Sequence, residues 1–303
     1  MDDDAPEEIR ALVARREERR AARDFRSADE LRERILSAGF ELDDTPFGPV
    51  VRRASPSVRR IPPHRVRPVL DEPPRFDVSV QWLVQGWPED AARGIEAFRR
   101  HHPGRSVQHV VVEAGEDRPQ AWPEDAEVVA LDRDPGWGAA RNAGLKRAAG
   151  RIVMVADSSV EPAGDVVTPL ERALSDPRVG VAGPVGAVTS DLARFQPSDG
   201  PEVDAIEGYL MAFRRGVAVR AGLFDERFRF YRVADLDLSF RIRDLGFVAM
   251  VVPVPIERHE HRAWANTPEP ERERLSKRNY NRFLDRWRGR FDLCSGPAVD
   301  RRT

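Results

Sequence analysis

An acidic side chain, Asp157, directly follows the apolar run Ile152–Ala156. A run that is short, apolar throughout and bounded by turn signals is typical of a buried parallel strand. In open α/β sheets, ligands bind outside the carboxyl ends of the strands. The Asp157 carboxylate is therefore expected at a ligand site, where its charge and its two oxygens can act on whatever binds.

The segments around Asp157 belong to a regular alternation. A turn at 134–136 precedes a predicted helix from about Gly138 to Ala149, which Gly150 is expected to end. Strands and helices alternate with connections of a few residues, which predicts an α/β fold with a mostly parallel sheet and helices on both faces. The predicted strands are 78–84, 107–112, 126–131 and 179–182, and the predicted helices are 87–101 and 165–175.

The later part of the chain is less regular. Residues 194–204 are polar and predict a loop, residues 206–213 a strand, and residues 214–221 a helix. In residues 235–246 the apolar side chains alternate as in a strand and also recur at helical spacing, so periodicity alone leaves both open. A further strand is predicted at 247–254 and a long charged helix at 268–291.

Composition argues against several classes of protein. The 303 residues carry a net charge of −2 with a pI near 6.4, which gives no general attraction to nucleic acids or membranes. The one cysteine, Cys294, cannot form a disulfide framework, and this favours a reducing, cytoplasmic setting. The acidic N-terminus lacks the apolar core of a signal peptide, and no apolar run approaches the roughly 18 residues of a membrane helix.

Four segments are expected along the chain. Residues 1–54 form a small helical unit, residues 55–76 a linker, residues 77–265 the α/β domain, and residues 266–303 a C-terminal helix and tail. The linker assignment rests on six prolines and five arginines, because proline at this density prevents helix and central strand.

The first unit is predicted to hold two helices and a hairpin. The second helix is expected to start at Ser27, whose spacing to Glu30 is that of a capping box. The stretch IRALVARREERRAARDFRSADELRERILSAGFELDDTPFGPVVRR resembles the small C-terminal module of bacterial cysteinyl-tRNA synthetases. No pair of zinc cysteines and no ATP-binding signature accompanies it, so the resemblance implies a borrowed module rather than a synthetase.

Residues 1–54 are a candidate contact with RNA or protein. Arginines recur at helical spacing and could track phosphates, namely Arg15, Arg16, Arg19, Arg20, Arg23 and Arg26. The alternative is an exposed face laced with ion pairs, which the balance of 11 arginines against 14 acidic residues favours. A protein-docking role stays equally open.

Several motifs of the α/β domain resemble family-2 glycosyltransferases, which have the GT-A, Rossmann-type nucleotide-sugar fold. The resemblance runs from about residue 78 to residue 261 and is carried by PGWGAARNAGLKRAAGRIVMVADSSVEP and YLMAFRRGVAVRAGLFDERFRFYRVADLDLSFRIRDLGF. The residues that match the family's helix opening are Gly138, Arg141, Asn142 and Gly144. The resemblance also favours a helix, starting at or after Asp235, over a strand.

The resemblance implies inverting transfer of a sugar from a nucleotide-sugar donor to a hydroxyl of a glycan, lipid or small-molecule acceptor. Glu113 stands where the family carries an Asp that contacts the base, and an ordinary loop acid is the alternative. Asn142 and Arg141 are expected on the donor side, since a guanidinium can bind the pyrophosphate in a fork. A surface salt bridge is the other interpretation of Arg141.

The resemblance also implies a cation, Mg²⁺ or Mn²⁺, on the diphosphate leaving group. The family commonly holds it with a DxD motif, because hard cations prefer carboxylate oxygen. Here the motif reads Asp157-Ser158-Ser159, so Asp157 is the remaining carboxylate. His259 is the expected further ligand and His261 its alternative, although two histidines in a solvated loop would look the same.

The general base is implied to be the Asp of a Glu-Asp pair at a helix start. Here the pair reads Ala234-Asp235, so Asp235 is the expected base and Asp237 its alternative. Asp235 can also cap its helix. The departures at Ser159 and Ala234 motivate a rival hypothesis, a weakened glycosyltransferase-like protein that binds without turnover.

Overall fold

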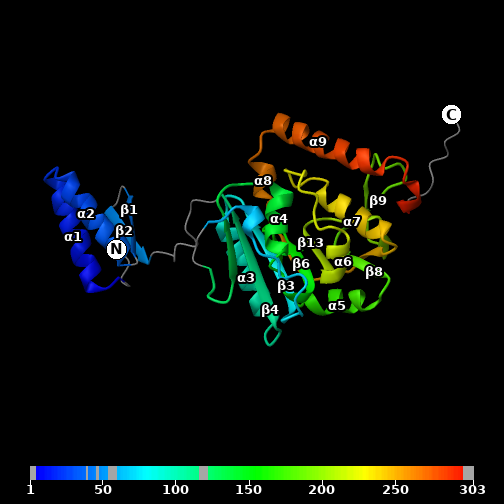
Figure 1. The fold of residues 1–303 in the computed structure, drawn as a ribbon, viewed down its shortest axis with the longest axis horizontal. Helices are drawn as coiled ribbons and strands as arrows, with labels where there is room; N and C mark the ends of the chain where they lie inside the picture. Colours follow the sequence, from blue (N-terminus) through cyan, green and yellow to red (C-terminus); the bar gives the residue numbers. More distant parts are fainter. Residues whose placement is uncertain (1–4, 39, 46–47, 54–59, 116–121, 296–303) are drawn as a thin grey trace. The chain divides into compact units, whose positions relative to one another are not determined.

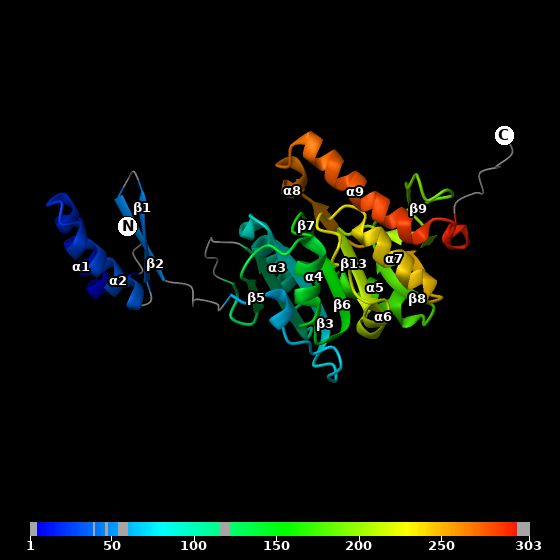
Figure 2. The same cartoon turned by 45° about the horizontal axis from the view of Figure 1, so that its top comes forward.

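The computed structural model describes residues 5–38, 40–45, 48–53, 60–115 and 122–295. The chain divides at about residue 60 into two compact units, which are described separately. Residue 54, residues 55–59 of the expected linker and residues 296–303 of the C-terminal tail lie outside the described residues. Figures 1 and 2 label the helices and strands.

The first unit contains the predicted two helices and hairpin. Helices α1 (Glu7–Ala21) and α2 (Phe25–Ser37) pack with an antiparallel pair, β1 (Phe40–Thr45) and β2 (Gly48–Arg53). The capping-box prediction is wrong, because α2 begins two residues earlier, at Phe25. The Asp24 carboxylate instead accepts a hydrogen bond from the Ser27 N–H at 3.2 Å.

An ion pair between a buried arginine and an exposed aspartate ties the helices of the first unit to its hairpin. The Arg16 side chain is 4% exposed and donates to both carboxylate oxygens of Asp44, at 2.8 Å each. The Asp44 carboxyl has a pKa well below its usual range, chiefly because of its hydrogen bond from Arg16. Arg16, Arg20 and Arg19 each contact an acidic residue, so part of the arginine stripe is engaged in ion pairs.

The second unit is built on an eight-stranded sheet in the order β11-β14-β8-β13-β6-β3-β4-β5. Strands β3, β4, β5 and β6 are parallel, as are β8 and β14, whereas β13 runs antiparallel between β6 and β8. The strands are β3 (Phe76–Val84), β4 (Val107–Ala114), β5 (Glu127–Leu131), β6 (Gly150–Ala156), β8 (Val179–Gly183), β11 (Glu202–Val203), β13 (Leu210–Arg214) and β14 (Val248–Val251). The prediction of a mostly parallel α/β sheet is confirmed.

Helices cover both faces of this sheet, as Figure 2 shows. The first face packs against α3 (Pro88–His101) and α5 (Val167–Ser175). The second packs against α4 (Trp137–Leu145), α6 (Arg215–Arg220) and α7 (Ala234–Asp244). Because both faces of the sheet are covered, the central strands consist of continuous apolar residues and do not alternate between apolar and polar residues.

Smaller elements frame the carboxyl end of the sheet. Strand β7 (Val160–Pro162) pairs with β15 (Ile256–Arg258), and β9 (Gly186–Val188) pairs with β10 (Gln196–Ser198) and β12 (Ala205–Ile206). Helix α8 (Arg262–Ala265) leads into the long α9 (Glu269–Trp287). Short 3-10 helices lie at Pro63–Arg65 and Phe291–Leu293.

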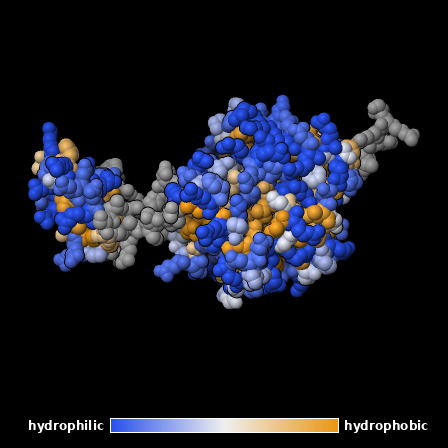
Figure 3. Space-filling model, in the orientation of Figure 1, coloured by the Kyte–Doolittle hydropathy of each residue, from blue (hydrophilic) through white to orange (hydrophobic). Residues whose placement is uncertain are grey.

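Helix α9 is charged, as predicted, and is buried along one side only. Phe283 and Trp287 are fully or nearly buried against Phe240 of α7. The edge of the second unit where α8 and α9 lie is mostly hydrophilic in Figure 3. Among the described helices, none has the length and apolar character to cross a membrane.

Two predictions about individual segments are wrong, and a third segment is settled. Gly150 does not end helix α4, which stops at Leu145; it begins β6, where an added Cβ would lie 2.3 Å from the Ser79 backbone nitrogen. Residues 194–204 hold strands β10 and β11, because edge strands need little apolar periodicity. The segment 235–246 is a helix, as the resemblance indicated.

Residues 60–75, expected as linker, pack on the second unit instead. The Ile61 N–H donates to the Ala130 carbonyl at 2.9 Å, and Ile61 forms an isolated parallel bridge with Leu131. Val66 and Val69 are 4% and 5% exposed, so the proline-rich segment buries apolar side chains that a composition argument does not register.

Candidate functional site

Asp157 follows β6 as expected, and its two carboxylate oxygens have different partners. Oδ1 accepts hydrogen bonds from the backbone N–H and the hydroxyl of Ser159, at 2.9 and 2.5 Å. Oδ2 faces Arg141 Nη2 at 3.9 Å and His261 Nε2 at 3.6 Å. The Ser159 hydroxyl therefore holds Asp157 in place, and Oδ2 is the oxygen left to act on a ligand.

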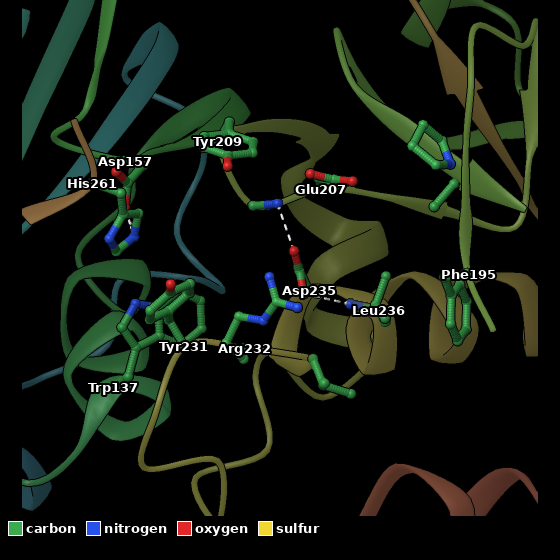
Figure 4. Close-up of a pocket in the computed structure, with 14 residues that line it drawn as sticks. Trp137, Asp157, Phe195, Glu207, Tyr209, Tyr231, Arg232, Asp235, Leu236 and His261 are labelled. Atoms are coloured by element: carbon green, nitrogen blue, oxygen red, sulfur yellow. Dashed lines mark hydrogen bonds and ion pairs between the residues drawn. The ribbon is translucent and has the colours of Figure 1, made fainter. Parts of the chain in front are cut away.

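Two adjoining pockets meet at Asp157. They share Trp137, Asp157, Tyr231 and His261. The smaller pocket extends toward the carboxyl end of β3 and is also lined by Gln85, Trp87, Arg141, Ser158 and Arg262. The larger, of about 220 Å³, extends toward the start of α7 and is drawn in Figure 4.

The start of helix α7 brings Asp235 into the larger pocket. Its Oδ2 accepts a hydrogen bond from the Gly208 N–H at 2.7 Å, and its Oδ1 accepts one from its neighbour Leu236 at 2.9 Å. Burial raises the pKa of the Asp235 carboxyl, and the two backbone donors oppose that rise. The preceding Val233 has a φ of 74°, which is strained for a β-branched residue and fixes the turn into the helix.

The alternative base, Asp237, does not line either pocket. Its side chain is 1% exposed, and it accepts hydrogen bonds from Arg241 Nε at 2.9 Å, Arg286 Nη1 at 2.9 Å and Trp287 Nε1 at 3.0 Å. Arg286 and Trp287 belong to the end of α9. Asp237 thus joins α7 to α9, and both of its oxygens are engaged.

Arg141 lies at the smaller pocket but is almost fully buried. Its Nη1 donates to Gln81 Oε1 at 2.7 Å and to the Ala156 carbonyl at 3.0 Å. Burial lowers its pKa to about 10, so it remains charged at neutral pH. This guanidinium holds the ends of β3 and β6 together and places a positive charge behind Asp157.

Asn142 is a buried connector and lines neither pocket. Its Nδ2 donates to the Phe224 carbonyl at 2.8 Å, and its Oδ1 accepts from the Phe224 N–H at 2.9 Å. The first N–H groups of α4 are also engaged within the protein, because those of Trp137 and Gly138 donate to the carbonyls of Arg229 and Phe228. A Cβ at Gly138 would lie 2.7 Å from the Asp225 carbonyl, so glycine permits this close approach.

Glu113 is the last-but-one residue of β4 and is 7% exposed. Its Oε1 accepts a hydrogen bond from Trp122 Nε1 at 2.7 Å, and its Oε2 lies 3.9 Å from Arg60. It does not line the two described pockets.

The two candidate histidines lie at different carboxylates. His259 Nε2 is 2.9 Å from Glu161 Oε2, and these two residues form a partly exposed cluster with Glu257. His261 instead lies at Asp157 and stacks on Tyr231, with ring centroids 4.3 Å apart. The structure therefore brings Asp157 together with His261 and not with His259.

Several pocket residues were not singled out from the sequence. They are Glu207, Tyr209, Tyr231 and Arg232. Glu207 and Tyr209 follow β12 in a connection without periodicity, and Tyr231 and Arg232 lie in the coil before α7. The only sequence signal was the position of all four inside or beside the second quoted motif, which does not separate lining residues from packed ones.

Comparison with known proteins finds a similarity to one family. Residues 110–235 match the model described as "Glycosyl transferase family 2". This part of the second unit is therefore similar to family 2 glycosyltransferases. This match spans β4 to the first residues of α7 and so includes both Asp157 and Asp235.

Solved glycosyltransferases have a similar fold. A crystal structure of GalNAc-T7 with UDP, GalNAc and Mn²⁺ aligns with a TM-score of 0.58 and 16% identity, over 72% of this chain and 49% of that chain. The mannosyltransferase PcManGT from Pyrobaculum calidifontis, in complex with GDP-Man and Mn²⁺, aligns with a TM-score of 0.50 and 18% identity, over 74% of this chain and 77% of its own. At these identities the likeness concerns the fold, and it confirms the GT-A fold predicted for the α/β domain.

The N-terminal part is similar to a synthetase, as predicted. It is 49% identical over 47 residues to a cysteine–tRNA ligase of Halorhodospira halophila (strain DSM 244 / SL1). The match covers 16% of this chain, and the chain spans about a tenth of the length of the curated relatives it matches.

Proposed function

We propose that the second unit transfers a sugar from a nucleotide-sugar donor to a hydroxyl of an acceptor, with inversion at the transferred carbon. The observation that carries the proposal is the pair of adjoining pockets, with Asp157 where they meet and Asp235 in the larger one. The family match supports transfer chemistry. The two similar solved structures are complexes with UDP, GalNAc and Mn²⁺ and with GDP-Man and Mn²⁺, which supports a nucleotide-sugar donor.

The smaller pocket suits the nucleotide diphosphate. Trp87 offers an aromatic face, and the buried Arg141 supplies positive charge, whereas Arg262 is paired with Glu89 and Asp90. Arg141 would act at a distance, through the field behind Asp157, because its own hydrogen bonds are made within the protein. For Glu113 a base contact remains a proposal, to be made through the carboxylate oxygen that Trp122 does not engage.

The residues at Asp157 fit a divalent cation. Bonds of about 2.1 Å at angles between about 90° and 120° separate two ligands of one ion by roughly 3.0–3.6 Å, and Asp157 Oδ2 and His261 Nε2 are 3.6 Å apart. For His261 to bind a cation through Nε2, its proton must be on Nδ1. In this structure Nδ1 accepts a hydrogen bond from the Trp264 N–H at 3.2 Å, and a protonated Nδ1 would lose that bond. The loss is tolerable because the same N–H also donates to the His261 carbonyl at 2.9 Å.

We therefore propose Asp157 and His261 as the protein ligands of Mg²⁺ or Mn²⁺, with His261 in place of His259. A cation there would neutralise the charge of the departing diphosphate. Since Ser159 offers a hydroxyl instead of a second carboxylate, most remaining ligands would come from the diphosphate and water.

Asp235 is the proposed general base. In the transfer, its carboxylate takes the proton of the acceptor hydroxyl, the acceptor oxygen forms a bond to the sugar's anomeric carbon, and the bond to the diphosphate oxygen breaks on the opposite side. The Gly208 and Leu236 N–H groups keep the carboxylate oriented. Asp237 is not proposed as a base, because its oxygens are engaged by Arg241, Arg286 and Trp287.

Nucleotide-sugar hydrolysis tests the proposal. Purified full-length protein would be incubated with a panel of UDP-, GDP- and dTDP-sugars and Mn²⁺, and the release of nucleoside diphosphate would be measured. We expect release from one nucleotide class and loss of release on removal of the metal with a chelator. Absence of release from every donor would contradict the proposal.

The rival is a protein that binds a nucleotide-sugar without turnover, which Ser159 and Ala234 favour. A donor that raises the melting temperature but gives no release would support the rival, since a ligand of the folded state raises apparent stability.

For the first unit, contact with RNA or with a protein remains a proposal. Its arginines could bind phosphates, although Arg16, Arg19 and Arg20 are engaged with acidic residues. A gel-shift titration with tRNA at increasing salt tests the RNA alternative, because phosphate contacts weaken steeply with salt. Absence of a shift at low salt would leave protein docking as the function of this unit.

A further inference from the structure

A second carboxylate, Glu207, lies at the Asp235 end of the larger pocket. It comes from the connection between β12 and β13, 28 residues before Asp235 along the chain. Within the part of the chain that the structure describes, no hydrogen bond or ion pair holds its carboxylate. Figure 4 shows Glu207 and Asp235 on one side of the pocket, near Arg232.

The backbone around Glu207 is held on both sides. Its own N–H donates to the Val185 carbonyl at 2.8 Å, and the next N–H, of Gly208, donates to Asp235 Oδ2 at 2.7 Å. A Cβ at Gly208 would lie only 3.3 Å from that same oxygen. These hydrogen bonds hold the turn that carries Glu207 next to the proposed base, so they fix the position of the Glu207 backbone relative to Asp235.

A carboxylate in this position is costly unless something binds it. Burial raises the pKa of Glu207, and the neighbouring charge of Asp235 raises it further. Polar groups in ligand pockets are few, and they fix the orientation of what binds. The pocket is also lined by the aromatic side chains of Tyr209, Phe195 and Trp137, which suits a ring with apolar C–H surface and hydroxyls at its rim.

Glu207 also supplies a second acid at this end of the pocket, which the helix-start pair Ala234-Asp235 lacks. The family pair at the helix start has two acids, whereas this chain has Ala234, which is 1% exposed and packs in the core. The second carboxylate of this end of the pocket therefore comes from a different segment of the fold.

We propose that Glu207 is an acceptor-binding residue that accepts a hydrogen bond from the hydroxyl next to the one that Asp235 deprotonates. The acceptor class that follows is a compound with adjacent hydroxyls, such as a sugar ring. A compound with a single hydroxyl would leave Glu207 unpartnered in the filled pocket. This inference rests on the proposed function, and it names a residue that binds the acceptor and the class of acceptor bound.

The test compares release of nucleoside diphosphate with and without an acceptor. The probes are methyl α-D-glucopyranoside, methyl α-D-galactopyranoside and methyl α-D-mannopyranoside, with cyclohexanol at equal concentration as the single-hydroxyl control. The proteins are the wild type, Glu207→Ala, Glu207→Gln and the matched control Glu202→Gln, an exposed acid on edge strand β11. Melting temperatures report whether each variant is folded.

We expect at least one glycoside, and not cyclohexanol, to increase release by the wild type. Glu207→Ala should lower the ratio of acceptor-dependent to acceptor-independent release by roughly tenfold to a hundredfold, chiefly through the KM for the glycoside. Glu207→Gln should lie between the two, because its amide oxygen still accepts a hydrogen bond, and Glu202→Gln should keep the wild-type ratio.

Two results would overturn the assignment while leaving the proposed function intact. One is acceptor-independent release that no glycoside increases. The other is an unchanged ratio in Glu207→Ala, including a parallel fall of both rates. Absence of any release, by contrast, would end the proposed function and this inference together.

Discussion

Asp235 and Asp237 are two residues apart on α7, yet their carboxylates have opposite surroundings. Asp235 faces a pocket and is held only by backbone N–H groups, whereas Asp237 is enclosed by Arg241, Arg286 and Trp287. An offset of two residues on a helix turns a side chain by about 200°, which is enough to separate a pocket face from a packing face. One acid is therefore available for chemistry and the other for stability.

The pH dependence of release should report the pKa of Asp235. A general base acts in its ionised form, and burial raises the pKa of this carboxyl above the ordinary aspartate value. Turnover should therefore rise with pH through that raised pKa and fall toward zero below it. A pH profile of kcat/KM checks this, and a rate that stays constant down to pH 4 would contradict it.

Substitution of Asp237 should affect stability. Asp237→Asn leaves the Arg241 guanidinium without its paired carboxylate in a largely buried place, while Arg286 keeps its pair with Asp225, and this should cost about 2–4 kcal/mol of unfolding free energy. Asp244→Asn, on the same helix, breaks the exposed pair with Arg290 and should leave the stability nearly unchanged, because exposed ion pairs are screened by solvent. Urea denaturation measures both, and equal losses in the two variants would argue against the buried clamp.

Substitution of His261 and of His259 should affect the Mn²⁺ requirement differently. His261→Ala removes a proposed ligand and should raise the Mn²⁺ concentration for half-maximal release about tenfold or more. His259→Ala is the matched control, because its ring contacts Glu161 outside the two pockets. If His259→Ala gave the larger shift, the cation would belong to the Glu161 side and the assignment to His261 would be wrong.

Asn142 should behave as a structural residue. Asn142→Ala leaves the N–H and the carbonyl of Phe224 unpaired in a buried place, at a cost of about 2–4 kcal/mol. Asn142→Asp keeps an acceptor for the N–H but places a buried carboxylate against the Phe224 carbonyl and the Glu226 carboxylate, so it should lose at least as much. Chemical denaturation gives the free energies, and a direct contact with the donor would instead show as a raised KM at unchanged stability.

The sequence predicts most of the fold because its signals are local. Apolar runs that end in turn residues gave β3, β4, β5, β6 and β8, and the place of Asp157 at the end of β6 followed from one of them. The predictions that fail depend on distant partners. Gly150 looks like a helix terminus until the Ser79 backbone beside it is known, and residues 60–75 look like a linker until their packing on β5 is seen.

The site is less accessible from the sequence for the same reason. The order of motifs predicted Asp235. No local sequence pattern, however, shows that side chains of α9 enclose Asp237, or that Asn142 hydrogen-bonds to the Phe224 backbone. Glu207 was missed because its importance depends on a contact across 27 residues, between its neighbour Gly208 and Asp235. Likewise, sequence could not choose between His259 and His261, which are two residues apart on either side of a turn.

The most direct test of the account is release of nucleoside diphosphate by Asp235→Asn beside the wild type, with the preferred nucleotide-sugar, Mn²⁺ and a glycoside acceptor. Loss of a general base should lower acceptor-dependent kcat by about 10²–10⁴-fold, and the melting temperature reports whether the variant is folded, since its amide oxygen can accept from only one of the Gly208 and Leu236 N–H groups. A variant that is folded and transfers at the wild-type rate would contradict the assignment of Asp235 as the base.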